Sequence, residues 1–158
     1  IPEIIKRQSE NQKQNSLLQI ITQIPKELIL HENTSGVCFV PRWARYPFEI
    51  WVVPHRRVSQ VYELDDEEIK NLSRLLLESS KMLDKVFDEP MPYTFAWQLA
   101  PKGYQDTHHL HWCFQPIKRS KTKLKYLAGV EQITGFYLVD LPPERSARIL
   151  RGEEQPDE

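Results

Sequence analysis

The sequence has little of what marks several classes of protein. It contains 2 cysteines among 158 residues, too few for a disulfide framework, so we expect a reducing, cytoplasmic setting. No apolar run approaches the ~20 residues that span a bilayer. Glu3 and Lys6 interrupt the apolar start of the chain. We therefore expect neither a membrane span nor a signal peptide.

An excess of charge of one sign is also lacking. The 21 Lys and Arg residues nearly balance the 22 Asp and Glu residues, and the formal net charge is -1. Such a chain has no overall field that attracts nucleic acid or an anionic membrane. We expect neither as a partner, so any recognition of phosphate must depend on local groups.

What is present fits one globular domain. Hydrophobic residues make up 40% of the chain and charged residues 27%, which is typical of globular proteins. A chain of this length buries about 68–70% of its unfolded surface, enough for a core. The composition along the chain divides it into an N-terminal helical arm (residues 1–28), a main domain (29–151) and an acidic, disordered tail (152–158).

Hydrophobic spacing predicts a long central helix and shorter helices near both ends of the chain. Residues 7–23 contain neither Gly nor Pro and favour a helix, as do residues 142–150. The central helix begins after Asp65, because Glu68 stands at the spacing of a capping box. Its predicted apolar stripe consists of Ile69, Leu72, Leu76, Leu83 and Val86.

Four segments rich in β-branched and aromatic residues predict strands at 36–41, 48–54, 93–99 and 108–115. The order of elements predicts an α+β fold, in which a long helix packs on a mostly antiparallel sheet and other helices flank it at the N- and C-terminal ends. We expect three tryptophans to lie in the core rather than to serve as stacking platforms. They are Trp43, Trp97 and Trp112.

A cluster of histidines is the main chemical signal. His108, His109 and His111 lie within four positions, and Cys113 follows. Alternate side chains of a strand share a face, so we expect His109, His111 and Cys113 on one face. The apolar residues between them, such as Trp112, are then expected on the core face.

Two chemistries suit such a row. A histidine can attack a phosphorus atom while a neighbouring group donates a proton to the leaving group. Alternatively, His and Cys at alternate positions can hold zinc together with ligands from elsewhere. Incidental histidines at a solvent-facing edge are the third interpretation. Several histidines and a cysteine at strand spacing favour a functional site.

Several motifs resemble the histidine-triad superfamily. They are Glu49–Val58, the long helix after it, and His109–Pro116, in which Cys113 stands at the third triad position. Within that superfamily the chain is most similar to the C-terminal half of the galactose-1-phosphate uridylyltransferase family. The segments that carry this similarity are Val40–Glu49, Tyr93–Pro101, Lys125–Glu131 and Pro142–Leu150. The resemblance implies a HIT-like fold for residues 29–151.

The resemblance also implies an activity. Family members transfer a nucleotidyl group between a nucleoside diphosphate sugar, such as UDP-glucose, and a hexose 1-phosphate through a histidine intermediate. Their nucleophile lies in the N-terminal half, in a His-Pro-His sequence that this chain lacks. If the chain acts alone, His111 is the nucleophile, and His109 hydrogen-bonds to it and orients it. The alternatives are a stand-alone hydrolase of nucleoside phosphoramidates or dinucleotides, and a non-catalytic module that binds a nucleotide or a partner.

A metal site is implied only weakly. In some family members the positions that match Gln98, His111 and Cys113 bind a metal, with a fourth ligand from the other half. A Cys can replace a His on zinc, but Gln98 is a poor ligand. His111 and Cys113 are therefore the weak candidates for a zinc site.

The resemblance also indicates how substrate and partner are bound. Gln98, Lys125, Tyr126 and Glu131 are the candidate substrate-binding residues, with Lys125 on phosphate and Glu131 on sugar hydroxyls. The plainer alternative is that residues 118–125 form a solvated loop and that Glu131 faces solvent. In the family, the segment that matches 125–131 reaches the partner subunit. The expected partners are thus a nucleotide sugar or sugar phosphate, and either a second copy or a missing N-terminal half.

Overall fold

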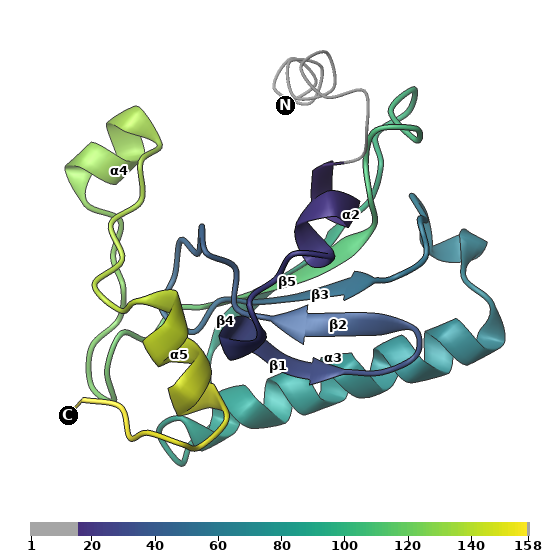
Figure 1. Cartoon of the computed structure of the whole chain (residues 1–158). Helices are drawn as coiled ribbons and strands as arrows, with labels where there is room; N and C mark the ends of the chain where they lie inside the picture. The colour runs from purple at the N-terminus through teal and green to yellow at the C-terminus, as the bar shows by residue number, and fades with distance from the viewer. Residues whose placement is uncertain (1–15, 158) are drawn as a thin grey trace.

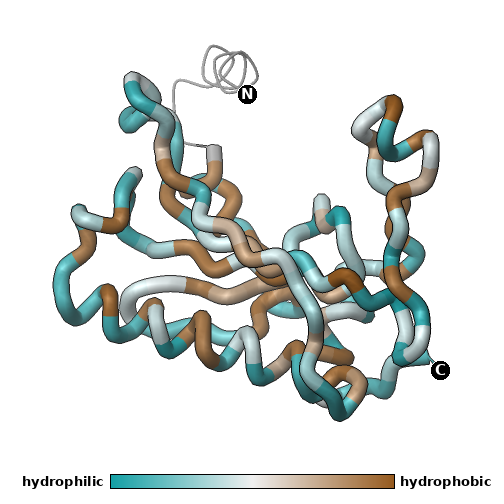
Figure 2. Tube along the Cα trace, turned by 180° about the vertical axis from the view of Figure 1, so that it is seen from behind, coloured by the Kyte–Doolittle hydropathy of each residue, from teal (hydrophilic) through white to brown (hydrophobic). Residues whose placement is uncertain are grey.

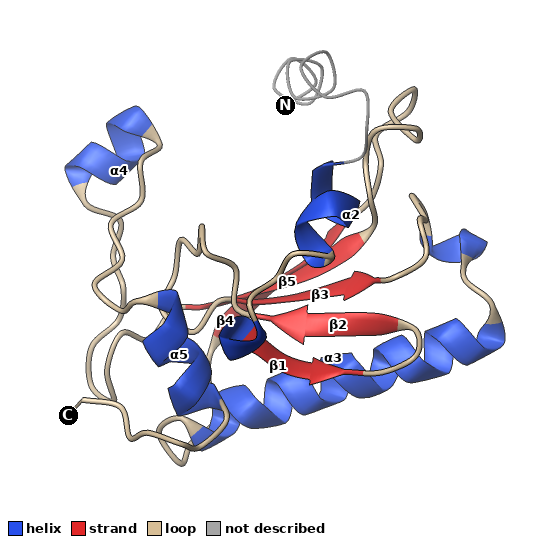
Figure 3. Cartoon of the chain, viewed as in Figure 1, coloured by secondary structure: helices blue, strands red, loops and turns tan. Residues whose placement is uncertain are grey.

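A five-stranded antiparallel sheet forms the centre of the molecule (Figures 1 and 3). The computed structural model describes residues 16–157. The strand order across the sheet is β1-β2-β3-β5-β4, so β1 and β4 are the edges. The strands are β1 (Ile29–Glu32), β2 (Gly36–Phe39), β3 (Ile50–Pro54), β4 (Tyr93–Gln98) and β5 (His111–Pro116).

Helices cover both faces of the sheet. The long α3 packs against β2 and β3 from one side, and residues of α2 pack against the other side. The described helices are α2 (Ser16–Ile21), α3 (Asp66–Lys85), α4 (Gly129–Thr134) and α5 (Pro143–Leu150), with 3-10 turns η1 (Lys26–Leu28) and η2 (Val61–Glu63). The predicted α+β fold with a long helix on an antiparallel sheet is confirmed.

The core lies mainly between α3 and the sheet. Cys38, Val52, Trp112 and Phe114 point from the strands into this larger cluster. A smaller cluster on the opposite face joins Val37, Phe39 and Val53 to the apolar residues of α2 and Trp51. Because β2 contributes to both clusters, all of its residues are buried.

The helix α3 begins as predicted, but its buried stripe differs in part. The Asp65 carboxylate accepts from the Glu68 N–H at 2.8 Å, and the Glu68 carboxylate accepts from the Asp65 N–H at 3.0 Å, which confirms the capping box. Ile69 is 43% exposed, so its assignment to the stripe is wrong. The line that faces the sheet passes through Leu72, Leu75, Ser79, Met82 and Leu83.

The strand β1 was not expected from the sequence. It has only four residues, with a bulge and an exposed His31 and Glu32, so it lacks the usual apolar signal. The turn after it depends on Asn33, whose side-chain oxygen accepts from the N–H groups of Ser35 and Gly36 at 2.9 and 3.1 Å. An asparagine that binds the backbone two and three residues on is a turn signal that the sequence did contain.

The two ends of the chain differ from expectation in different ways. Of the predicted helix at 7–23, α2 covers Ser16–Ile21, and residues 7–15 lie outside the described residues. The acidic tail, expected to be disordered, lies against α5 instead. Arg145 pairs with Glu154 and Asp157 at 2.7 and 2.6 Å, and Arg148 also pairs with Glu154.

Two further features bear on the site. A segment that contains α4, residues 124–141, projects away from the sheet (Figure 1), and we call it the α4 extension. Hydrophobic residues colour much of it brown in Figure 2, although it lies outside the core. Within residues 16–157, no helix is both long and apolar enough to cross a membrane.

Replacing Gly36 with Ala is predicted to destabilise the fold. A Cβ at Gly36 would lie 2.6 Å from the Leu72 Cδ2 atom and 2.7 Å from the Val53 carbonyl oxygen, and the backbone atom cannot easily move. We expect a loss of about 1–3 kcal/mol in the free energy of unfolding, measured by urea titration. Gly129→Ala is the matched control, because its Cβ meets nothing within 4 Å and Ala favours a helix. The control should be neutral or stabilising by up to about 1 kcal/mol, and equal losses in both variants would contradict the packing argument.

Candidate functional site

His111 opens β5, on the face of the sheet opposite α3. Its neighbour across the sheet in β4 is Gln98, and Cys113 pairs with Trp51 of β3. The intervening Trp112 and Phe114 belong to the core. The predicted division of this strand into a core face and a polar face is therefore confirmed for residues 111–114.

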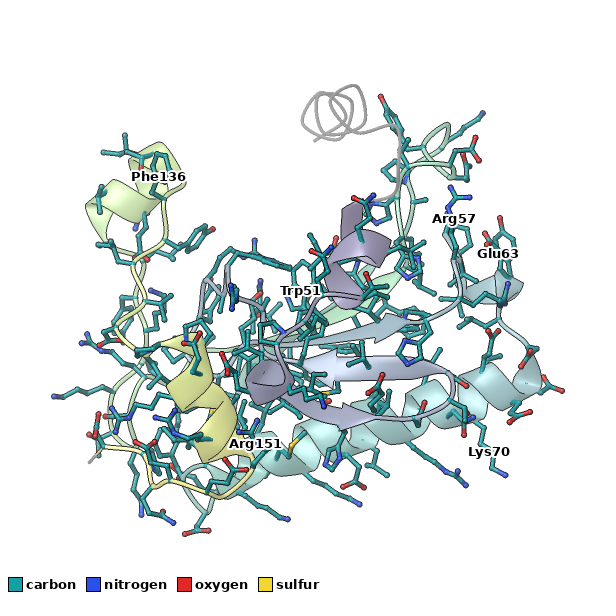
Figure 4. The ribbon with its side chains drawn as sticks, viewed as in Figure 1. Trp51, Arg57, Glu63, Lys70, Phe136 and Arg151 are labelled. Atoms are coloured by element: carbon teal, nitrogen blue, oxygen red, sulfur yellow. The ribbon has the colours of Figure 1, made fainter. Side chains whose placement is uncertain are left out.

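The His111 ring is held in one tautomer. Its Nδ1 lies 2.8 Å from the His109 carbonyl oxygen, and because a carbonyl only accepts, Nδ1 carries the proton. Nε2 then holds the lone pair. The ring stacks on Trp51, with centroids 4.5 Å apart and planes 21° apart (Figure 4 labels Trp51).

Burial keeps this imidazole neutral. The His111 side chain is 8% exposed, and burial lowers its pKa from 6.5 to about 4, partly offset by the hydrogen bond to the His109 carbonyl. At neutral pH, Nε2 is thus an unprotonated nitrogen on a fixed ring. That is the state a histidine needs for nucleophilic attack on phosphorus, and equally for accepting a hydrogen bond from a ligand.

His109 does not share the face of His111. It precedes β5, so strand alternation does not extend to it. Its Nε2 lies 2.8 Å from the Pro54 carbonyl oxygen, and its Nδ1 accepts from the Val58 N–H at 3.4 Å. The imidazole of His109 therefore ties β5 to the segment after β3. The expected hydrogen bond to His111 exists, but it comes from the main-chain carbonyl rather than the ring.

His108 is a residue that the sequence analysis left without a role. Its Nε2 lies 3.2 Å from the Gln98 carbonyl oxygen, and its ring centroid is 5.7 Å from that of His111. Burial lowers its pKa. Together with Gln98 it forms the border of the site toward the edge strand β4.

Within residues 16–157, the donors at this site do not make up a complete zinc site. The Cys113 thiol is 1% exposed, and burial, together with the charge of Glu49, raises its pKa to about 12. Without a metal, the Cys113 thiol therefore stays protonated at neutral pH. The bond from His111 Nδ1–H to a carbonyl is compatible with zinc on Nε2, but Gln98 is a poor ligand. Among residues 16–157, no three His, Cys, Asp or Glu side chains come together as a metal site.

The other candidates, Lys125, Tyr126 and Glu131, lie on the α4 extension. Glu131 is 4% exposed, so the alternative that it faces solvent is wrong. Its carboxylate accepts from Lys125 Nζ at 2.9 Å and from the N–H groups of Ala128 and Leu138 at 2.6 and 2.8 Å. These bonds, led by the one from Lys125, lower its pKa to about 2.

Lys125 is equally committed to the structure. Its ammonium donates to Glu131 and, at 2.8 Å, to the Leu138 carbonyl, and it lies 5.9 Å from the centre of the Tyr46 ring. Tyr126, by contrast, is 79% exposed. The structure thus gathers Gln98, His111 and Cys113 on the sheet and the other three candidates on the α4 extension.

Two aromatic residues expected in the core are exposed. Trp97 on the edge strand β4 is 54% exposed and Trp43 is 41% exposed, whereas Trp112 is buried at 3%. β4 lacks a covering helix, so the aromatic residues on it remain open. Trp43 packs edge-on against Trp51 with ring centroids 5.3 Å apart.

Glu49 and Trp51 are residues that sequence reasoning did not place in the site. Both stand in or beside the segment Val40–Glu49 that carried the family resemblance. Glu49 is fully buried, and its carboxylate accepts from the Trp51 indole N–H at 2.8 Å. The sequence signal that could have identified Glu49 was its position between the aromatic residues Phe48 and Trp51, directly before a strand.

Comparison with known proteins agrees with this architecture. The family model described as "Galactose-1-phosphate uridyl transferase, C-terminal domain" matches residues 8–157. A galactose-1-phosphate uridylyltransferase of Thermotoga maritima is 32% identical over 148 residues, which cover 92% of this chain and 46% of that protein. The corresponding enzyme of Haemophilus influenzae is 35% identical over 129 residues, which cover 80% of this chain and 37% of that protein.

Solved structures give the same result. A uridylyltransferase structure superposes with a TM-score of 0.84 at 27% identity, covering 96% of this chain and 48% of that one. A zinc-bound histidine triad family protein from Mycobacterium smegmatis shares the fold, with a TM-score of 0.61 and 14% identity. An ADP-glucose phosphorylase of Arabidopsis thaliana is 29% identical over 128 residues. The chain spans less than half the length of the curated relatives described here.

Titration of His111 is predicted to make stability depend on pH. The unfolded histidine takes up a proton near pH 6.5 and the folded one only near pH 4. Stability from the neutral ring is therefore complete above about pH 6.5 and falls as the pH drops to about 4. The loss is on the order of 3 kcal/mol.

His111→Asn tests this, because the Asn amide can still donate to the His109 carbonyl but does not titrate. Urea titrations at pH 7.5, 5.5 and 4.5 should show a smaller loss of stability on acidification in the variant. A His108→Asn variant, at a less buried ring, controls for general effects of removing a histidine. Parallel pH curves for the His111 variant and the unmodified chain would contradict the assignment.

Proposed function

Because the chain belongs to the galactose-1-phosphate uridyl transferase family, as its C-terminal domain, we propose that it is half of a nucleotidyltransferase. The reaction moves a nucleotidyl group between a nucleoside diphosphate sugar and a hexose 1-phosphate. The observation that carries the proposal is the family match over residues 8–157, together with a neutral, fixed His111 on the face of the sheet opposite α3. The names of the relatives favour a uridylyl group and galactose 1-phosphate as substrates.

The proposed chemistry proceeds in two displacements. A histidine nitrogen attacks the α-phosphorus of the nucleotide sugar, so a P–N bond forms and the P–O bond to the departing sugar phosphate breaks. A phosphate oxygen of the second sugar phosphate then attacks the same phosphorus, and the P–N bond breaks. The His-Pro-His sequence of the family is absent from this chain, so we assign the nucleophile to the other half. His111 Nε2 is the nucleophile if the chain acts alone.

The proposed roles of the other candidates follow from their positions. Gln98 lies beside His111 and can hydrogen-bond to the ligand there. Tyr126 is exposed on the α4 extension, where its ring can pack against a sugar. Lys125 donates to Glu131 and to the Leu138 carbonyl, so one N–H of its ammonium remains for a sugar phosphate.

Two surfaces support the proposed need for another polypeptide. β4 is an edge strand without a charged residue, and its Tyr93, Phe95 and Trp97 are each more than a third exposed. Unprotected apolar edges of this kind pair readily with another strand. The α4 extension also exposes apolar side chains, with Ile133 at 87% and Phe136 at 77% (Figure 4 labels Phe136 on it).

We propose that the missing half covers the β4 edge and that the α4 extension reaches a second copy, as the family resemblance implies. A cytoplasmic setting belongs to the same proposal, since both cysteines are free and buried. A second candidate function is nucleotidyl transfer to inorganic phosphate, which the similarity to an ADP-glucose phosphorylase favours. Both functions use the same histidine chemistry and differ in the acceptor.

A chimera tests the proposed function. We would replace the matching second half of the Thermotoga maritima enzyme with this chain and measure exchange of label between galactose 1-phosphate and UDP-galactose. The expected result is exchange by the chimera and none by the chain alone. Phosphate replaces galactose 1-phosphate in a parallel assay for the phosphorylase reaction, and ADP-glucose is tried beside UDP-glucose.

Intact mass spectrometry after incubation with UDP-glucose separates the outcomes. A uridylyl adduct on the chain alone, lost in His111→Asn, would move the nucleophile to His111 while supporting the transferase. Release of nucleoside monophosphate without an acceptor would favour a hydrolase instead. A folded chimera that binds UDP-glucose but neither exchanges nor forms an adduct would refute the proposal.

A further inference from the structure

The buried carboxylate of Glu49 is the best-satisfied charged group near His111. Glu49 is 0% exposed. One of its oxygens accepts from the main-chain N–H groups of Arg45 and Tyr46 at 2.8 and 3.3 Å. The other accepts from the Trp51 indole N–H at 2.8 Å, with the Arg45 guanidinium 3.8 Å away. A buried charge is costly unless it is hydrogen-bonded in this way, so these donors fix the carboxylate in place.

Trp51 carries this constraint to His111. Its indole N–H is bound to Glu49, while its ring face stacks on the imidazole at 4.5 Å. Trp43 contacts the same indole edge-on at 5.3 Å, and Phe39 lies 6.5 Å from it. An indole held by a hydrogen bond and by neighbouring rings cannot rotate away from the histidine that it supports.

His111 is therefore fixed by two independent contacts. The His109 carbonyl sets the tautomer and the rotation of the ring about its Cβ, and Trp51 covers one ring face. Nε2 makes no hydrogen bond to the described residues. A nitrogen fixed and unprotonated in this way is prepared to meet a ligand at a defined position.

We infer that Glu49 is a positioning residue, which acts through the Trp51 indole to hold the His111 imidazole in the orientation that the site requires. The contacts from Glu49 through Trp51 to His111 do not depend on whether the protein has an enzymatic activity. Its consequence for turnover rests on the proposed nucleotidyl transfer.

The same carboxylate also connects the two groups of candidate residues. It holds the main chain at Tyr46, and the Tyr46 ring lies 6.3 Å from the Tyr137 ring and 5.9 Å from Lys125 Nζ. The base of the α4 extension is thus attached to the segment that Glu49 orders. Loss of Glu49 should disturb His111 on one side and the base of the extension on the other.

NMR of the histidine side chains in the intact chain tests the inference. In the unmodified chain, long-range 15N–1H spectra should show His111 as a single tautomer with the proton on Nδ1. Glu49→Gln places an amide NH2 among N–H donors, so we expect the other His111 tautomer to appear. Because a ring that is no longer held in place loses part of the burial that lowers its pKa, we also expect the His111 pKa to rise. The Trp51 indole N–H signal should shift as well.

Glu68→Gln is the matched control. The Glu68 carboxylate also accepts from an arginine and from a main-chain N–H, but it caps α3. That variant should leave the tautomer and titration of His111 unchanged, even if it lowers stability. The contrast separates positioning from a general loss of stability.

Trp51→Phe keeps the inference testable if Glu49→Gln does not fold. It retains an aromatic ring against His111 but removes the indole N–H. We expect the other His111 tautomer to appear, as in Glu49→Gln. The double variant should perturb His111 no more than the stronger single variant, because both break one connection. An unchanged His111 tautomer and titration in folded Glu49→Gln or Trp51→Phe would overturn the inference.

Activity gives a separate readout in the chimera. There the other half supplies the nucleophile, so a misplaced His111 weakens a contact with the ligand, and Glu49→Gln should raise KM about tenfold with kcat within about threefold. An inactive parent chimera would refute the proposed function but leave the NMR result, and therefore the inference on Glu49, standing.

Discussion

The pairing of β5 between β3 and β4 is the constraint on which the site depends. Trp112 and Phe114 must face α3 because they fill the core, and a strand turns the side chains next to them to the opposite face. His111 and Cys113 therefore face away from α3, and the register places Trp51 and Gln98 beside them. A slip of one residue would bury the histidine in the core and expose the aromatic residues, so core packing fixes the site.

Sequence patterns predicted the parts of the fold that depend on local structure. The capping box at Asp65 and the apolar spacing after it are readable because they involve residues within a few turns of one another. β1 was missed because its pairing with β2, rather than its own composition, makes it a strand. The burial of Glu131 and the ring contacts of His109 were missed because both depend on partners that the chain folds back to provide. The family resemblance identified the candidate residues, but it did not show which of their atoms remain free to contact a ligand.

Two buried glutamates perform the same physical task at different places. Glu49 binds main-chain N–H groups of Arg45 and Tyr46, and Glu131 binds those of Ala128 and Leu138. Neither segment has enough regular structure to satisfy its own backbone, and a carboxylate can accept several N–H bonds at once. Charged hydrogen bonds thus replace secondary structure where the chain must hold a defined shape outside the sheet.

The arrangement of charge supports the proposal that this domain is half of a site. A nucleotidyl transfer needs cations close to the phosphates, yet the groups that adjoin His111 are neutral rings, an amide and a protonated thiol, and the nearby Arg45 guanidinium is paired with Glu49. The buried Trp112 indole N–H also lacks an acceptor within residues 16–157, beneath the exposed Trp97 on β4. A strand added to the β4 edge would lie two strand spacings from β5, about 10 Å. Under the proposed function, a strand of the missing half at this edge would extend the sheet and bring arginine or lysine side chains toward the His111 face.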